Sequence, residues 1–155
     1  MAAKDAAPRP LSSEGAAQAE DLLHETYEVT KVLLGSGADG GVSRGMHRDS
    51  GQAHALKYLS RHAYCTGEHR ELEILQKFQK HPHPNVLALI ADFAPIAPSR
   101  PQWVLATQEA ECNLRTFVWR HQSEIRTIAR SLGSQILTGL RLIHYHRVLH
   151  RDLKP

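Results

Sequence analysis

The fold is decided by residues 27–59, which read YEVTKVLLGSGADGGVSRGMHRDSGQAHALKYL. Runs rich in β-branched and aromatic residues alternate here with clusters of Gly, Asp and Ser, a pattern typical of strands joined by tight turns. The expected strands and turns are, in chain order, Tyr27–Leu34, Gly35–Gly41, Val42–Arg48, Asp49–Gly51 and Gln52–Leu59. The stretch therefore predicts an antiparallel β-meander with a glycine-rich first corner.

A helix is expected over Gly67–Lys80, because Ile74, Leu75 and Phe78 fall on one stripe when each residue turns by about 100°. Glu71 lies near the centre of this stripe. A carboxylate in an apolar stripe is costly unless an interior group pairs with it. We therefore expect Glu71 to have a partner.

Two further strands are expected at Val86–Phe93 and Gln102–Thr107, with a proline-rich loop between them. A long helix at 125–147 is then predicted by apolar residues spaced three or four apart, which are Ile128, Leu132, Ile136, Leu140 and Ile143. Its apolar face is broad, as in a helix that packs among others. Because nothing after it in the sequence would cover that face, we expect the isolated chain to be poorly soluble.

The composition is that of a globular protein of one domain, with 155 residues, 41% hydrophobic and 23% charged. The longest apolar run, Val86–Ala91, is far shorter than the ~20 residues of a membrane span, so no membrane partner is expected. The formal charge of +3 is scattered, which gives no sign of a nucleic-acid partner. Cys65 and Cys112 form no Cys-x-x-Cys pair, which favours a reducing, intracellular location in cytoplasm or nucleus.

The glycines follow the pattern Gly35-x-Gly37-x-x-Gly40, which is weak evidence by itself because many hairpin corners use glycine. A dinucleotide-binding fold would continue from such glycines into a helix, whereas Val42 begins a strand here. A Walker loop needs Gly-Lys-Ser/Thr, which is absent. A glycine-rich loop between two strands is typical of the loop that covers the nucleotide in protein kinases.

Three further motifs follow in the order that this family requires. They are Ala55-Leu56-Lys57 on the third strand, Glu71 on the next helix and His150-Arg151-Asp152-Leu153-Lys154-Pro155 after the long helix. From Tyr27 to Pro155 the chain thus resembles the N-terminal part of a eukaryotic serine/threonine protein kinase domain. The resemblance implies an α+β fold, in which a five-stranded antiparallel sheet with one helix precedes the first helices of an α-rich large lobe.

The resemblance also implies roles for single residues in the transfer of the ATP γ-phosphate to protein Ser/Thr hydroxyls. Lys57 would hold the α- and β-phosphates, and Glu71 would position Lys57. Asp152 would accept the proton of the substrate hydroxyl, and Lys154 would contact the γ-phosphate. Arg151 corresponds to the residue that pairs with a phosphorylated activation loop.

The resemblance further implies an ATP site around the glycine loop. Its expected residues are Leu34, Gly35, Ser36, Gly37, Ala38, Asp39, Gly40, Gly41, Val42, Ala55 and Lys57. The stretch Val104–Ala110 would connect the two lobes and offer backbone amides and carbonyls to the adenine ring. Leu34, Val42 and Ala55 would sandwich that ring, although these three residues also suit an ordinary sheet core.

Two residues depart from the family pattern. Asp39 stands at the tip of the glycine loop, where an aromatic residue is usual, and its carboxylate would repel a triphosphate. We therefore expect Asp39→Asn or Asp39→Phe to tighten ATP binding in a nucleotide titration, and unchanged affinity would contradict this. His54 stands where Val is common, which an alternating strand tolerates.

Histidines and a cysteine raise further hypotheses. The pairs His81/His83 and His144/His146 suggest a metal, but no cysteine or acid completes a four-ligand set, so solvated or capping histidines are favoured. Cys112 would lie just past the lobe connector as either a reactive or a buried inert thiol.

The family pattern places its Mg²⁺ ligands beyond Pro155, so no metal ligand is expected in this chain. Residues 1–25 are expected to be a disordered arm with a short helix near Glu20–Glu25. The kinase domain is expected over 26–155, with the small lobe at about 26–107 and the start of the large lobe at about 108–155.

Two hypotheses about the whole protein follow. The first is an N-terminal fragment of an active kinase that uses ATP, Mg²⁺, a protein substrate and a regulatory protein partner. The second is a short pseudokinase-like module that binds nucleotide or protein without catalysis. Intact Lys57, Glu71 and Asp152 favour the first.

Overall fold

A computed structural model describes residues 22–37, 40–59, 70–94 and 103–155. Several expectations fall outside these residues, namely most of the arm, the loop tip at Ala38 and Asp39, Cys65, the first turn of the Gly67–Lys80 helix and most of the proline-rich loop. The chain divides into two compact units, and each is described by itself. The sheet unit comprises Met1–Glu73 and Leu89–Glu109, and the helical unit comprises Ile74–Ala88 and Ala110–Pro155.

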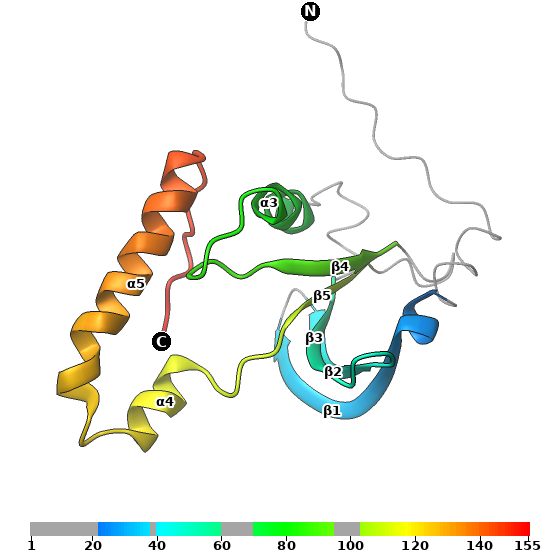
Figure 1. Cartoon of the computed structure of the whole chain (residues 1–155), viewed down its shortest axis with the longest axis horizontal. Helices are drawn as coiled ribbons and strands as arrows, with labels where there is room; N and C mark the ends of the chain where they lie inside the picture. The colour runs from blue at the N-terminus through cyan, green and yellow to red at the C-terminus, as the bar shows by residue number, and fades with distance from the viewer. Residues whose placement is uncertain (1–21, 38–39, 60–69, 95–102) are drawn as a thin grey trace, which may run out of the picture. The chain divides into compact units, whose positions relative to one another are not determined.

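The sheet unit contains the predicted antiparallel sheet. Its strands are β1 (Tyr27–Gly37), β2 (Gly40–His47), β3 (Ala53–Tyr58), β4 (Leu89–Phe93) and β5 (Val104–Gln108). They pair in the order β1-β2-β3-β5-β4, and every pair is antiparallel. The expectation of a five-stranded antiparallel sheet is confirmed, and β1 and β2 curve together as a hairpin (Figure 1).

The strand register sorts the side chains onto two faces of the sheet, because directly paired residues point to the same side. Val42 pairs with Lys57, Arg44 with Ala55, and Ala55 in turn with Thr107. These five residues define one face, called here the lysine face. The opposite face carries the alternate residues of the same strands.

Leu105, which is fully buried, pairs with Lys57 and so lies on the lysine face. The hydrophobic core cluster of the sheet unit lies on the opposite face. Its buried members are Leu23, Tyr27, Leu56, Phe93, Val104 and Ala106. Tyr27 is fully buried and meets the rings of His47 and Phe93 edge-on, at centroid distances of 5.3 and 5.9 Å. Gly45 is required by this packing, because a Cβ there would lie 2.4 Å from Leu56 Cδ1.

Residues 22–26 are helical, close to the short helix expected near Glu20–Glu25. Leu23 is 1% exposed and belongs to the core, although it falls in the segment assigned to the disordered arm. The polar composition of residues 1–25 as a whole conceals this one anchoring side chain. The helical turn is fixed to the end of β2, since Arg48 Nε donates to the His24 carbonyl over 2.7 Å.

The helices lie in or lead into the helical unit. They are α3 (Arg70–Gln79), whose first four residues belong to the sheet unit, α4 (Leu114–Arg120) and α5 (Ile125–Tyr145). The long helix predicted at 125–147 is therefore present as α5. The sequence analysis did not single out α4, although Asn113 caps it by accepting from Thr116 N–H over 2.8 Å.

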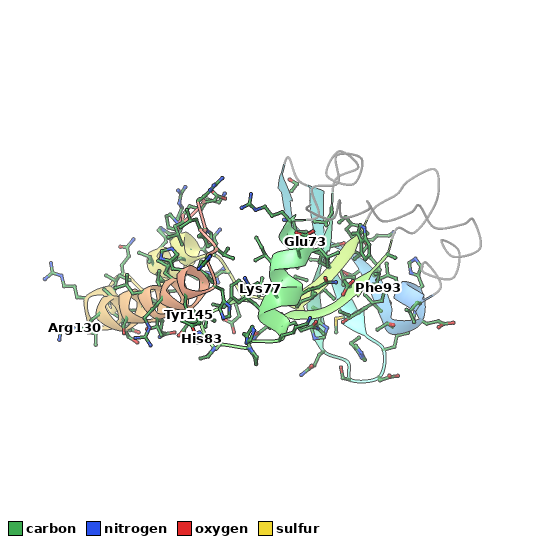
Figure 2. All side chains as sticks on the ribbon, turned by 90° about the horizontal axis from the view of Figure 1, so that it is seen from above. Glu73, Lys77, His83, Phe93, Arg130 and Tyr145 are labelled. Carbon is green, nitrogen blue, oxygen red and sulfur yellow. The ribbon has the colours of Figure 1, made fainter. Side chains whose placement is uncertain are left out.

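The helical unit buries few side chains among its described residues. Figure 2 shows Arg130 and Tyr145 extending from α5, and Tyr145 is 82% exposed. On α3, Glu73 and Lys77 occupy successive turns in the same view, and Lys77 Nζ donates to the His146 carbonyl over 2.9 Å. Among the described residues, no helix combines the length and apolar character needed to cross a bilayer.

Candidate functional site

The glycine motif forms the closed end of the β1–β2 hairpin. Gly35 pairs with Val42, Ser36 with Gly41 and Gly37 with Gly40. Gly40 has φ of 130°, a conformation that a residue with a side chain rarely adopts. The tip at residues 38–39 lies outside the described residues, so the expectation about Asp39 stays a prediction.

Gly35 and Gly41 differ from Gly40 in not having a positive φ. A Cβ added at either position would meet nothing within 4 Å, and neither residue has a positive φ. Neither packing nor backbone conformation therefore requires glycine there. Bare backbone at both positions leaves room and free approach for a ligand such as a phosphate chain.

Lys57 and Glu71 form the ion pair that the position of Glu71 predicts. Lys57 Nζ lies 2.7 Å from both carboxylate oxygens of Glu71. Lys57 stands in the interior of β3 and Glu71 in the first turn of α3, and both residues belong to the sheet unit. Their side chains are 28% and 42% exposed, so a ligand can reach the pair from solvent.

Leu34, Val42 and Ala55 are not members of the buried core cluster. Val42 and Ala55 are half-buried on the lysine face, and Leu34 is 38% exposed at the glycine hairpin. Of the two interpretations offered by the sequence, the placement favours an apolar surface open to a ligand over the sheet core.

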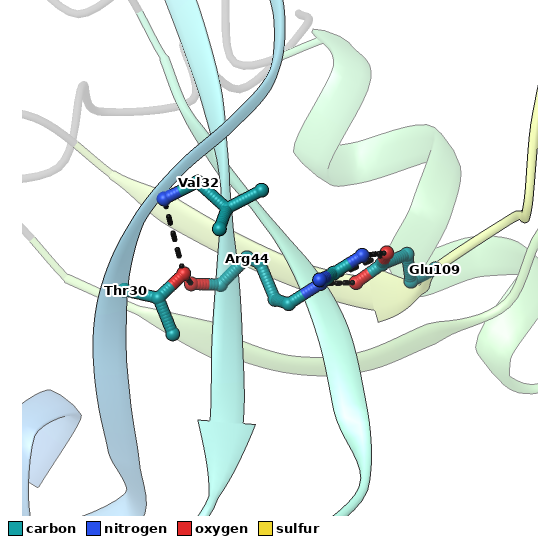
Figure 3. Close-up of polar contacts among 4 residues, drawn as sticks. All are labelled: Thr30, Val32, Arg44 and Glu109. Atoms are coloured by element: carbon teal, nitrogen blue, oxygen red, sulfur yellow. Dashed lines mark hydrogen bonds and ion pairs between the residues drawn. The ribbon is translucent and has the colours of Figure 1, made fainter.

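The lysine face carries a second ion pair, which the sequence analysis did not identify. Arg44 on β2 holds Glu109, the residue after β5, through both carboxylate oxygens (Figure 3). The Nε distances to Oε1 and Oε2 are 3.0 and 2.8 Å. The two residues are 65 positions apart, so no local pattern reveals the pair, and only the β2–β3–β5 pairing brings them together.

Hydrogen bonding and charge from Arg44 lower the pKa of Glu109, against an opposing effect of burial. The same contacts raise the pKa of Arg44. Both side chains are therefore ionised at neutral pH. The connector is expected over Val104–Ala110, but Val104–Gln108 form strand β5, so only Glu109 and Ala110 of that stretch lie beyond the sheet.

The remaining predicted catalytic residues lie at the end of the helical unit. Lys154 Nζ lies 2.8 Å from Asp152 Oδ2, and both side chains are 73% exposed. The Asp152 backbone N–H donates to His150 Nδ1 over 3.3 Å. The hydrogen bond from Lys154 and its charge lower the pKa of Asp152, so Asp152 is a carboxylate at neutral pH.

Arg151 has φ of 63°, a left-handed conformation that costs a non-glycine residue about 1–3 kcal/mol. Such strained residues cluster at functional sites, and this one directly precedes Asp152. Arg147, a few residues earlier, is also left-handed, with φ of 60°.

The histidines form a contact other than the predicted pairs. His81 and His146, one from each pair, stack with ring centroids 4.6 Å apart. Burial, His81 and Lys77 all lower the pKa of His146, which favours the neutral ring. The described residues contain no group of three or more His, Cys, Asp or Glu side chains placed to hold a metal ion. Cys112 is a free, half-buried thiol.

Comparison with known proteins places this geometry in context. The family model of the protein kinase domain matches residues 27–155. Mitogen-activated protein kinase 13 of Pan troglodytes is 34% identical over 139 residues, which cover 86% of this chain and 36% of the relative. Mitogen-activated protein kinase KSS1 of Saccharomyces cerevisiae is 30% identical over 79% of this chain and 35% of the relative.

A solved structure is similar as well. The crystal structure of Rad53 1-466 in complex with AMP-PNP matches 86% of this chain and 34% of that chain, with a TM-score of 0.66 and 28% identity. The chain thus spans about a third of the length of these two mitogen-activated protein kinases.

Proposed function

The chain belongs to the protein kinase domain family, and from this we infer that it forms the N-terminal part of an ATP-dependent serine/threonine protein kinase. The observation that carries the proposal is the Lys57–Glu71 ion pair. A lysine inside a strand and a glutamate on the following helix meet at 2.7 Å beside a glycine hairpin whose backbone is bare. An ordinary sheet surface needs neither feature.

The chemistry assigned to the sheet unit is the binding of nucleotide. ATP supplies the γ-phosphoryl group, and the transfer needs positioning and neutralisation of charge more than covalent chemistry. The backbone of Gly35–Gly41 would cover the phosphates, Lys57 would neutralise their charge, and Glu71 would hold the Lys57 ammonium in place. Val42 and Ala55 on the lysine face, with Leu34, would cover the base.

The chemistry assigned to the helical unit is orientation of the acceptor. The ionised Asp152 would accept the hydrogen bond of a substrate hydroxyl and then its proton. Lys154, now paired with Asp152, would move to the transferring phosphate. Mg²⁺ would neutralise phosphate charge in such a reaction, and the residues that this structure describes offer no cluster to which we assign it.

The test uses the endogenous protein, captured through residues 1–25 and weighed intact. We expect a mass well above the 17.3 kDa of this chain, and transfer of γ-phosphate from ATP to Ser/Thr peptides. Asp152→Asn in that protein should lower the transfer rate by about 10²–10⁴-fold, and Lys57→Met should weaken nucleotide binding. Asp49→Asn and Lys31→Met, in an exposed turn and on an exposed part of β1, are the matched controls.

A mass of 17.3 kDa with nucleotide binding but no transfer would support the short, non-catalytic module instead. Transfer that persists in Asp152→Asn would contradict the role given to Asp152.

A further inference from the structure

The Arg44–Glu109 ion pair lies on the same face of the sheet as the residues assigned to nucleotide binding. Arg44 is two residues after Val42 on β2 and pairs directly with Ala55 on β3. Glu109 is two residues after Thr107, which pairs with the same Ala55. The ion pair therefore spans β3 next to the proposed base-covering residues and ties β2 to the end of β5.

The backbone of Arg44 is fixed from its other side by β1. Thr30 Oγ1 donates to the Arg44 carbonyl over 2.9 Å and accepts from Val32 N–H at 3.2 Å (Figure 3). These bonds lie where the β1–β2 register shifts between Val29 and Leu33. Arg44 thus joins the glycine hairpin to the point where the connector leaves the sheet.

The pair differs from an ordinary surface ion pair in two respects. Both carboxylate oxygens of Glu109 are held by the guanidinium, a geometry that fixes direction as well as distance. The Glu109 side chain is also only 12% exposed, against 42% for Glu71 and 73% for Asp152. The carboxylate is therefore screened less by water, and its charge acts more strongly on a nearby ligand.

We propose that Arg44 and Glu109 are positioning residues of the nucleotide site, with two effects on a bound nucleoside triphosphate. Their ion pair fixes the start of the connector relative to the glycine hairpin, and Arg44 cancels a carboxylate charge that would otherwise repel the anionic ligand. The inference rests on the proposed function.

Replacing Arg44 and replacing Glu109 should then have unequal effects on nucleotide affinity. Arg44→Gln leaves a negative charge on the lysine face and releases the connector, so both effects oppose binding. Glu109→Gln also releases the connector, but it leaves a positive charge that attracts phosphate. A purely structural pair predicts equal losses of stability for the two variants and no such asymmetry in affinity.

The experiment titrates a fluorescent ATP analogue into the full 155-residue chain and its variants, with thermal unfolding of each measured alongside. We expect Arg44→Gln to weaken binding about tenfold and Glu109→Gln about threefold, within the range of coupling between contacting residues. The exchanged pair, Arg44→Glu with Glu109→Arg, should restore at least half of the lost affinity on a logarithmic scale. Added salt should reduce the difference in nucleotide affinity between Arg44→Gln and Glu109→Gln, because it screens the charge that each variant leaves.

Arg48→Gln is the matched control. It removes an arginine contact from the end of β2, to the His24 carbonyl, and leaves both members of the Arg44–Glu109 pair in place. Wild-type affinity in Arg44→Gln, or equal weakening in Arg44→Gln and Arg48→Gln, would overturn the inference while the proposed function stands. Failure of the wild-type chain to bind the analogue would overturn nucleotide binding by this chain and the inference with it.

Discussion

The sheet unit and the helical unit have similarly apolar sequence patterns but bury them to different extents. On the core face of the sheet, Tyr27, Leu56, Val104 and Ala106 are all fully buried. On α5, only Ile143 of the predicted apolar face is buried, Ile136 is 42% exposed, and the other three residues are half-buried. The difference shows that an apolar pattern identifies which face of a helix can be buried. Whether that face is buried depends on whether other segments pack against it.

The comparison is tested most strongly by truncating one leucine in each unit. Leu56→Ala should lower the free energy of unfolding by about 2–5 kcal/mol, because Leu56 is fully buried in the sheet core. Leu137→Ala should change it by less than about 0.5 kcal/mol, since Leu137 is 67% exposed on α5. Urea unfolding of both variants measures the difference.

Leu137→Ala should also raise the solubility of the chain, because it removes part of the exposed apolar face of α5. Equal destabilisation by the two truncations would mean that α5 is covered in solution, and would remove the contrast between the units.

A smaller effect is expected from adding one methyl group to a glycine in each unit. Gly45→Ala should cost about 1–3 kcal/mol, because the new Cβ would lie 2.4 Å from Leu56 Cδ1 and 3.2 Å from Tyr27 Cδ1. Gly133→Ala on α5 meets nothing within 4 Å and should stabilise the helix by about 0.5–1 kcal/mol. Opposite shifts of the thermal unfolding midpoint in the two variants would support this prediction. An unchanged midpoint in Gly45→Ala would show that the core repacks around the added methyl group without cost.

How far the sequence predicts this molecule depends on the separation of the interacting residues. Alternation and turn residues predict the strands and the hairpin between β1 and β2, since those signals act within a few residues. They place the turn at Gly35–Gly41, whereas β1 runs to Gly37 and β2 begins at Gly40, because glycines can pair as strand residues too. Glu71 could be predicted to need a partner because its helical stripe is visible in the sequence. Arg44–Glu109 and Tyr27–His54 could not, because pairing across 65 and 27 positions appears only when the strands are assembled.

The next prediction concerns how the unfolding free energy of the sheet unit depends on pH. Tyr27 Oη lies 2.8 Å from His54 Nδ1, and His54 is 8% exposed in the sheet core. Burial, with a smaller effect of His47, lowers the pKa of His54 below its ordinary value near 6.5. The unfolded chain therefore takes up this proton first. The stabilisation is complete above about pH 6.5 and is lost as the pH falls toward the folded pKa.

The variant that tests this is His54→Gln, which keeps a side-chain hydrogen-bond partner for Tyr27 but does not ionise in this range. We expect the loss of unfolding free energy between pH 7 and pH 5 to be smaller in His54→Gln than in the wild type. His144→Gln, at an exposed position of α5, is the control in the helical unit and should leave the pH profile of the wild type unchanged. Identical pH profiles for the wild type and His54→Gln would contradict the role of His54.

The smallest effect is expected at Asp152, where a charge contact is present with little burial. The Lys154 ammonium lowers the pKa of Asp152, with a lesser contribution from His150. Lys154→Met should therefore raise the Asp152 pKa toward the ordinary carboxyl range, as followed by NMR titration of its side-chain carbon. Lys80→Met, at an exposed position just after α3, should leave that pKa unchanged.

The stability of the fold should not follow this pKa, because both side chains are 73% exposed and solvent screens the pair. Asp152 is ionised at neutral pH with or without Lys154, so its protonation cannot be the reason for an effect of Lys154 on phosphoryl transfer. An unshifted Asp152 pKa in Lys154→Met would mean that the pair does not persist in solution. A shifted pKa with unchanged stability would show that the contact affects the charge near Asp152 without stabilising the fold. Leu56 in the sheet unit has the opposite role, because it stabilises the fold and carries no charge.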